Sequence, residues 1–109
     1  MSVNIPASVL ERLLSVVYSE PSVSQLWLFG SWARGDNRIN SDIDLLLVGE
    51  NIPRSIHTKL RESAGLYKLD ILRPEEISNE AVSNEINKDK VLLFDREVSS
   101  ARTKASIFE

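Results

Sequence analysis

Hydrophobic residues along this chain recur with two spacings, one typical of helices and one typical of strands. In residues 6–18 the apolar positions lie three or four apart, which makes one broad apolar face and predicts a helix. A narrower stripe with the same spacing predicts a second helix over residues 53–64, with Gly65 as its C-terminal cap. Asn4 is of a residue type that caps helices, and we expect it to cap the first one.

Apolar runs short enough to be strands lie at residues 25–29, 41–48, 66–72 and 91–94. The first run is apolar on both faces, which favours an interior position in a sheet. After it, the segment GSWARG predicts a short helical turn that leads into a polar loop. Pro74, followed by two glutamates, starts a further helix that we expect to continue to about Lys88.

The order of these elements predicts an α/β (α+β) fold in which helices cover a mixed four-stranded sheet. A chain of 109 residues fits one domain, which we place at residues 1–95. Residues 96–109 are polar with few apolar anchors. We therefore expect a C-terminal tail that is frayed or depends on a partner.

Composition narrows the classes of function. The net charge of −3 argues against a nucleic-acid-binding surface, which is normally basic. The absence of cysteine excludes disulfides and thiolate metal sites, and the single histidine argues against a histidine-based zinc site. The sequence shows no signal-peptide pattern and no apolar run of membrane-spanning length. We expect a soluble, cytoplasmic protein that binds neither nucleic acid nor membrane directly.

The candidate chemistry lies at the ends of the first two strands. Asp42 and Asp44 open the second apolar run, and their spacing places both on one face of a strand. Two neighbouring carboxylates repel each other, and a hard cation such as Mg²⁺, which binds carboxylates and substrate phosphates, would stabilise them. Gly30 permits close approach of a phosphate to the backbone, and Ser31 suits the start of a short helix that attracts anions.

These residues carry a resemblance to a known family. Gly30-Ser31, ten intervening residues and then Asp42-x-Asp44 resemble the motif of the DNA polymerase β-like nucleotidyltransferase superfamily. The longer string GSWARGDNRINSDIDLLL is similar to the minimal nucleotidyltransferase (MNT) family within it. The resemblance covers essentially the whole chain and implies the nucleotidyltransferase fold. That family has a third carboxylate on a later strand, and Asp70 occupies the matching position.

The resemblance implies a role for each acidic residue. Asp42 and Asp44 would bind Mg²⁺, with two ions as the usual arrangement for such displacements. Asp70 would share a metal ion and would orient the acceptor hydroxyl or take its proton. Each aspartate also has a purely structural interpretation: Asp42 as a turn cap, Asp44 as an exposed strand-end charge, and Asp70 as an ion-pair partner of Lys68 or an arginine.

The triphosphate of ATP, the expected substrate, would be held beside the glycine–serine turn. Gly30 and Ser31 would bind the β- and γ-phosphates. Arg34 and Arg38 flank this position, and a guanidinium offers several donors in a fixed fork. Simple solvation is an equally good interpretation of either arginine.

The resemblance also implies a partner. MNT proteins commonly act as antitoxins of HEPN/MNT toxin–antitoxin pairs, in which AMP is transferred from ATP to a tyrosine hydroxyl of the HEPN ribonuclease toxin. Two alternatives stay open at this point. In the first, the chain is a non-catalytic antitoxin that neutralises its partner by covering it. In the second, the chain transfers a nucleotide to a small molecule.

Overall fold

The computed structural model describes residues 4–97 and confirms the α/β prediction. The elements are α1 (Ala7–Tyr18), β1 (Val23–Phe29), α2 (Ser31–Arg34), β2 (Ile43–Gly49), α3 (Arg54–Ser63), β3 (Leu69–Leu72), the 3-10 helix η1 (Pro74–Glu76), α4 (Glu80–Asp89) and β4 (Val91–Asp95). The short helical turn expected in GSWARG is α2. The described helices are all too short or too polar to cross a membrane.

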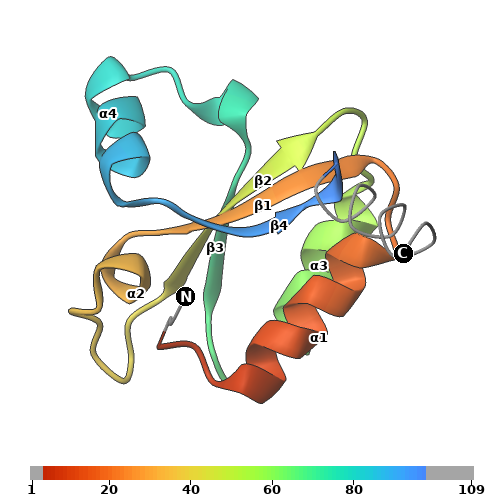
Figure 1. Cartoon of the computed structure of the whole chain (residues 1–109), viewed down its shortest axis with the longest axis horizontal. Coiled ribbons are helices and arrows are strands. Elements are labelled where there is room, and N and C mark those ends of the chain that lie inside the picture. Colours follow the sequence, from red (N-terminus) through yellow and green to blue (C-terminus); the bar gives the residue numbers. More distant parts are fainter. Residues whose placement is uncertain (1–3, 98–109) are drawn as a thin grey trace, which may run out of the picture.

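The strands form one mixed sheet in the order β3-β2-β1-β4. β2 and β3 are parallel, whereas β1 pairs with β2 and β4 in antiparallel fashion. The predicted interior position of β1 is confirmed. The helices α1 and α3 lie together on one side of the sheet, and α4 lies on the other side (Figure 1).

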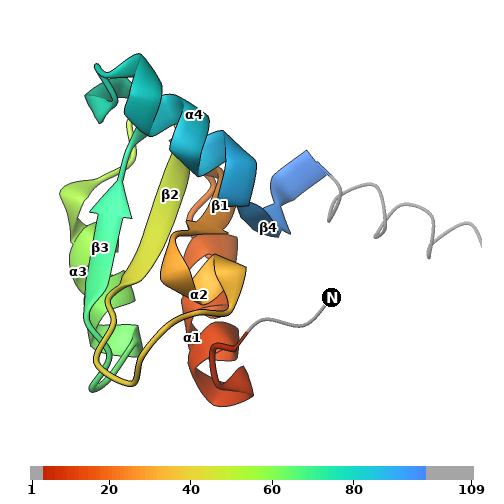
Figure 2. The ribbon, with the colours of Figure 1, turned by 90° about the vertical axis from the view of Figure 1, so that its left-hand side faces the viewer.

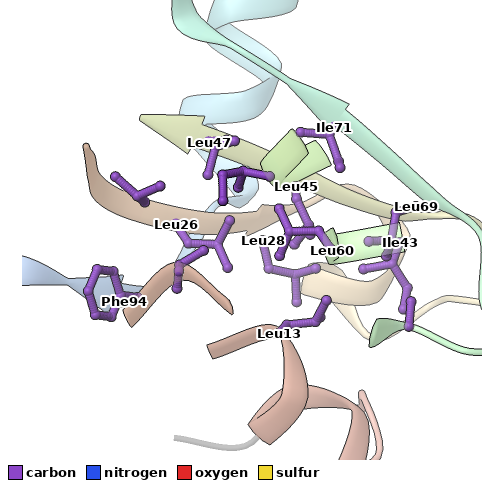
Figure 3. Close-up of a cluster of buried hydrophobic side chains, with 14 of the residues drawn as sticks. Leu13, Leu26, Leu28, Ile43, Leu45, Leu47, Leu60, Leu69, Ile71 and Phe94 are labelled. Carbon is purple, nitrogen blue, oxygen red and sulfur yellow. The ribbon is translucent and has the colours of Figure 1, made fainter. Parts of the chain in front are cut away.

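The alternation of side chains along β1 and β2 decides which face of the sheet is packed. Fully buried residues from the strands meet α1 and α3 in one core, which includes Leu13, Leu26, Leu28, Ile43, Leu45, Leu47 and Leu60 (Figure 3). Because successive residues of a strand point to opposite faces, Asp44 and Leu46 point to the side of α4. The candidate chemistry therefore faces away from the main core.

The prediction of one helix from Pro74 to about Lys88 is wrong. The 3-10 helix η1 ends at Glu76, and Ile77 is extended with φ −88° and ψ 103°. Asn79 then caps a new helix, because its side-chain oxygen accepts a hydrogen bond of 2.8 Å from the Ala81 N–H. A residue that favours the helix cap so strongly competes with continuation of the preceding turn.

Other local expectations also differ from the structure. Asn4 does not cap α1, because the helix begins after Pro6 and has no side-chain cap. The side-chain amide of Asn4 instead donates a hydrogen bond to Asn37 Oδ1 at 3.0 Å. β3 begins at Leu69, so Leu66 lies in the turn before it and is fully exposed. β2 begins at Ile43, which leaves Asp42 one residue outside the strand.

The predicted C-terminal tail falls almost entirely outside the described residues. Its first residue, Arg96, is described and well anchored. Arg96 Nε donates to the Val23 carbonyl at 2.8 Å, and Nη2 donates to the carbonyls of Val17 at 2.8 Å and Glu20 at 2.9 Å. The boundary at residue 95 stays a prediction.

Candidate active site

Parallel pairing of β2 and β3 places two of the predicted site residues side by side. Asp44 and Asp70 are direct partners in the register of these strands. Their neighbours Ile43 and Leu69 are also partners and are buried in the core. Because side chains alternate, Asp44 and Asp70 both project from the opposite face of the sheet. Asp70 is exposed there, and Asp44 is partly buried.

Asp42 adds a third negative charge to this group. It is exposed and immediately precedes β2. Burial, followed by the charges of Asp70 and Asp42, raises the pKa of Asp44 to about 6, while Arg34 acts in the opposite direction. Each of the three carboxylates is free of ion pairs with lysine, arginine or histidine in residues 4–97. The charges thus influence one another without being neutralised by a described cation.

The glycine–serine turn lies directly against Asp44. Phe29, the last residue of β1, pairs with Asp44 across the sheet, and Gly30 follows with φ +75°. A Cβ atom at Gly30 would overlap Asp44 Oδ2, so the backbone and the carboxylate approach each other more closely than any other residue would allow. The structure therefore brings Gly30, Ser31 and Asp44 to one place, as their sequence spacing indicates.

Trp32 fixes α2 in this position. Its side chain is 5% exposed, and Nε1 donates to the Ser41 carbonyl at 3.0 Å. Its ring also meets the ring of Tyr67 edge to face, with 5.7 Å between centroids. One side chain thus ties the glycine–serine turn to the segment before Asp42 and to the turn before β3.

The two predicted phosphate-binding arginines have different surroundings. Arg34 Nη1 lies 2.8 Å from Asp89 Oδ2, and Nε lies 3.1 Å from Asp36 Oδ2. These two hydrogen bonds raise the pKa of Arg34, and the bond to Asp89 has the larger effect. A guanidinium has five N–H groups, so three remain for a ligand. Arg38 is exposed in the loop, where its backbone N–H donates to Ser41 Oγ at 2.8 Å.

The donor set fits a hard cation. Asp42, Asp44 and Asp70 offer only carboxylate oxygens, which Mg²⁺ prefers, and a cation would relieve the unfavourable charge of Asp44. Within the described residues, however, these groups are not drawn together into a three-ligand cage. Their assignment as metal ligands stays a prediction.

Comparison with known proteins shows the family to which the chain belongs. Residues 11–99 match the family described as polymerase beta, nucleotidyltransferase. The chain belongs to this nucleotidyltransferase family. The match includes the glycine–serine turn and all three aspartates.

Individual relatives of this nucleotidyltransferase were found by sequence and by structure. "Putative protein adenylyltransferase MJ0604" of Methanocaldococcus jannaschii is 36% identical over 64 residues, which are 56% of this chain and 64% of that protein. A chain of a toxin–antitoxin crystal structure with AMP-PNP has a TM-score of 0.63 at 17% identity, covering 90% of this chain and 86% of its own. A chain from a tri-AMPylated Shewanella oneidensis HEPN toxin in complex with MNT antitoxin has a TM-score of 0.59 at 12% identity, covering 92% and 83%. The two structures establish the nucleotidyltransferase fold.

Two residues near the site of this nucleotidyltransferase were not among the sequence candidates. Trp32 connects three segments of the site. Asp89, the partner of Arg34, was missed altogether because 55 positions separate the two residues. The only signal for Asp89 was an acidic residue near the end of a predicted helix, where acidic residues are unfavourable.

Proposed function

We propose that this chain is a Mg²⁺-dependent nucleotidyltransferase that transfers AMP from ATP to a hydroxyl group of a partner protein. The observation that carries the proposal is the placement of Asp44 beside Asp70 and directly against the backbone of Gly30. Family membership supports the reaction type. The name of the M. jannaschii relative supports a protein as the acceptor.

The triphosphate binds at the glycine–serine turn. Gly30 allows the phosphates to approach the backbone, and Ser31 donates its hydroxyl to them. Arg34 contributes N–H groups that its two carboxylate partners leave free. Arg38, in the exposed loop, adds a second positive charge near the phosphates.

Asp42, Asp44 and Asp70 would hold Mg²⁺, with two ions expected. The bound metal would neutralise the negative charge that develops on the phosphates and would lower the pKa of the acceptor hydroxyl. Asp44 lies deepest of the three and borders both the phosphate turn and Asp70. It thus connects the two halves of the site.

Asp70 is the exposed carboxylate on the acceptor side and orients the incoming hydroxyl. In the transfer step the hydroxyl oxygen forms a bond to the α-phosphorus of ATP, and its proton passes to Asp70. The bond from the α-phosphorus to the bridging oxygen breaks, and pyrophosphate leaves with that electron pair.

The partner that we propose is a HEPN toxin, with a tyrosine hydroxyl as the acceptor and this chain as the antitoxin. The structurally similar complexes, which contain a toxin, AMP-PNP or an AMPylated HEPN protein, support this choice. The net charge of −3 is consistent with a protein partner in place of a nucleic acid.

The test is to co-express the chain with the protein encoded by the adjoining gene and to measure the intact mass of that protein. We expect the mass to increase by one or more AMP groups, and the increase to disappear with Asp44→Asn. No AMP transfer to any partner protein with Mg²⁺ present and the chain folded would contradict the proposal. Toxin neutralisation that persists in the Asp42→Asn/Asp44→Asn variant would instead show that covering the partner is sufficient, and AMP found only on small molecules would identify a different acceptor class.

A further inference from the structure

Two large aliphatic side chains beside the candidate active site are left in solvent. Ile39 is 91% exposed and Leu66 is fully exposed, although apolar side chains of this size gain about 1.5–3 kcal/mol each when they are buried. Ile39 lies in the loop between α2 and β2, and Leu66 lies in the turn between α3 and β3. Both line one hollow of about 550 Å³, which we call the 39/66 hollow; its other lining residues are Asn40, Ser41, Tyr67 and Lys68.

The 39/66 hollow is built on fixed groups. The buried Trp32 donates a hydrogen bond to the Ser41 carbonyl and packs against Tyr67. It therefore contacts both the loop before β2 and the turn before β3. The Ile43 N–H donates to the Lys68 carbonyl at 2.9 Å, which joins the two segments where they enter β2 and β3. Figure 2 shows the loop after α2 and the turn before β3 together at the lower end of the sheet.

The 39/66 hollow adjoins the acceptor side of the site. Ile39 is three positions before Asp42, and Leu66 is four positions before Asp70. Even fully extended chain spans at most about 14 Å over four residues. A standard protein interface covers about 800 Å² on each partner, a patch with a radius of roughly 16 Å. A standard interface centred on Asp70 therefore reaches Leu66, and Ile39 lines the same hollow as Leu66.

We infer that the 39/66 hollow is the docking surface for the acceptor protein. The partner is a folded protein that presents an apolar side chain close to its modified hydroxyl. Ile39, Leu66 and Tyr67 supply apolar contact for that side chain, and Lys68, the one charged lining residue, pairs with an acidic group or carbonyl at the rim. This inference rests on the proposed function and adds to it the surface that selects the partner.

The test compares Ile39→Ser/Leu66→Ser with Tyr18→Ser, in which an aromatic side chain that is 65% exposed at the end of α1 is removed. The acceptor is the protein encoded by the adjoining gene. We expect the double variant to raise the KM for this acceptor at least about tenfold, which corresponds to 1.4 kcal/mol, with kcat at saturation and ATP affinity unchanged. Tyr18→Ser should leave all three values unchanged.

Direct binding separates failure of docking from failure of transfer. The affinity of the adjoining-gene protein is measured with Asp44→Asn alone and with Asp44→Asn/Ile39→Ser/Leu66→Ser. A loss of affinity in the triple variant supports the docking surface even if no AMP is ever transferred, an outcome that would contradict only the proposed function. Unchanged affinity, or no binding by Asp44→Asn and the unaltered chain, would overturn the docking inference. Unfolding midpoints should not fall, because both substituted side chains are exposed.

Discussion

The Asp44 carboxylate is placed where its own charge is unfavourable. It is partly buried, pairs with Asp70 across the sheet, and touches the backbone at Gly30. Burial and the neighbouring carboxylates raise its pKa to about 6. Such placements destabilise the folded protein and recur at catalytic sites, where the charge is needed for a ligand.

Asp44→Asn should therefore stabilise the metal-free protein. The pKa of the folded state is above the unfolded value of 3.8, so the carboxylate destabilises the fold as pH rises through about 6. We expect Asp44→Asn to increase the free energy of unfolding by about 1 kcal/mol at pH 8, allowing for solvent screening of a group that is only partly buried. Below about pH 4 the gain should disappear, because both proteins are then neutral at this position.

Urea unfolding at both pH values, in buffer with EDTA, measures this difference. Glu11→Gln, on the exposed side of α1, is the matched control and should change little at either pH. A loss of stability in Asp44→Asn at pH 8 would mean that Asp44 has a stabilising partner.

At the scale of elements, α4 is a separate helix that lies on the same side of the sheet as the candidate site. It begins at a new cap because Asn79 interrupts the chain after η1. The side chain of Ile86 on this helix is buried. At the C-terminal end of the helix, Asp89 binds Arg34, and the amine of Lys90 lies 4.5 Å from the centre of the Trp27 ring. The helix thus orients the arginine that we assign to the triphosphate.

We expect Asp89→Asn to weaken ATP binding about tenfold, which corresponds to the loss of one charge-assisted hydrogen bond that orients Arg34. AMP, which lacks the β- and γ-phosphates, should bind with little change. Fluorescence titration with both nucleotides gives the ratio of affinities.

Asp36→Asn is the control for this pair, because Asp36 also binds Arg34 but is 61% exposed, compared with 12% for Asp89. Its effect on ATP should be smaller. An equal loss for ATP and AMP in Asp89→Asn would point to a general disturbance of α4 and not to orientation of Arg34.

At the scale of the whole molecule, Arg96 closes the fold. It follows β4 and donates to carbonyls of Val17, Glu20 and Val23, which lie 73 to 79 positions earlier in the chain. It therefore fastens the end of an edge strand to the connection between α1 and β1. Its guanidinium also lies 5.1 Å from the centre of the Phe94 ring.

Arg96→Ala should lower the free energy of unfolding by about 2–3 kcal/mol, because partly buried carbonyls lose charged donors. Arg96→Lys should recover part of the loss, since an ammonium keeps the charge but lacks the planar fork. Denaturant unfolding measures both variants. Arg61→Ala, on the exposed side of α3, should have a small effect; a similar loss there would show that net charge and not local contacts is responsible.

Prediction from the sequence worked best where the structure of a segment depends on residues close together in the chain. The run from β1 through α2 to β2 was predicted in the right order because two short apolar runs, a glycine and paired aspartates follow one another closely in the chain. The break after Glu76 was missed because Pro74 and the following glutamates favour a helix start, while the competing cap at Asn79 decides where α4 begins. The predicted assignments of the seven site residues stay open to the experiments above.

By itself, the sequence determined where the strands lie, the alternation that keeps Asp44 off the core, and the glycine at position 30, because strand period and backbone freedom are local properties. Only the tertiary structure decided that Asp70 is the register partner of Asp44, that Asp89 holds Arg34, that Trp32 joins three segments, and that Ile39 and Leu66 meet at one hollow. These pairings connect residues 9 to 55 positions apart. They depend on how the strands and α4 pack together, and no periodicity along the chain encodes that geometry.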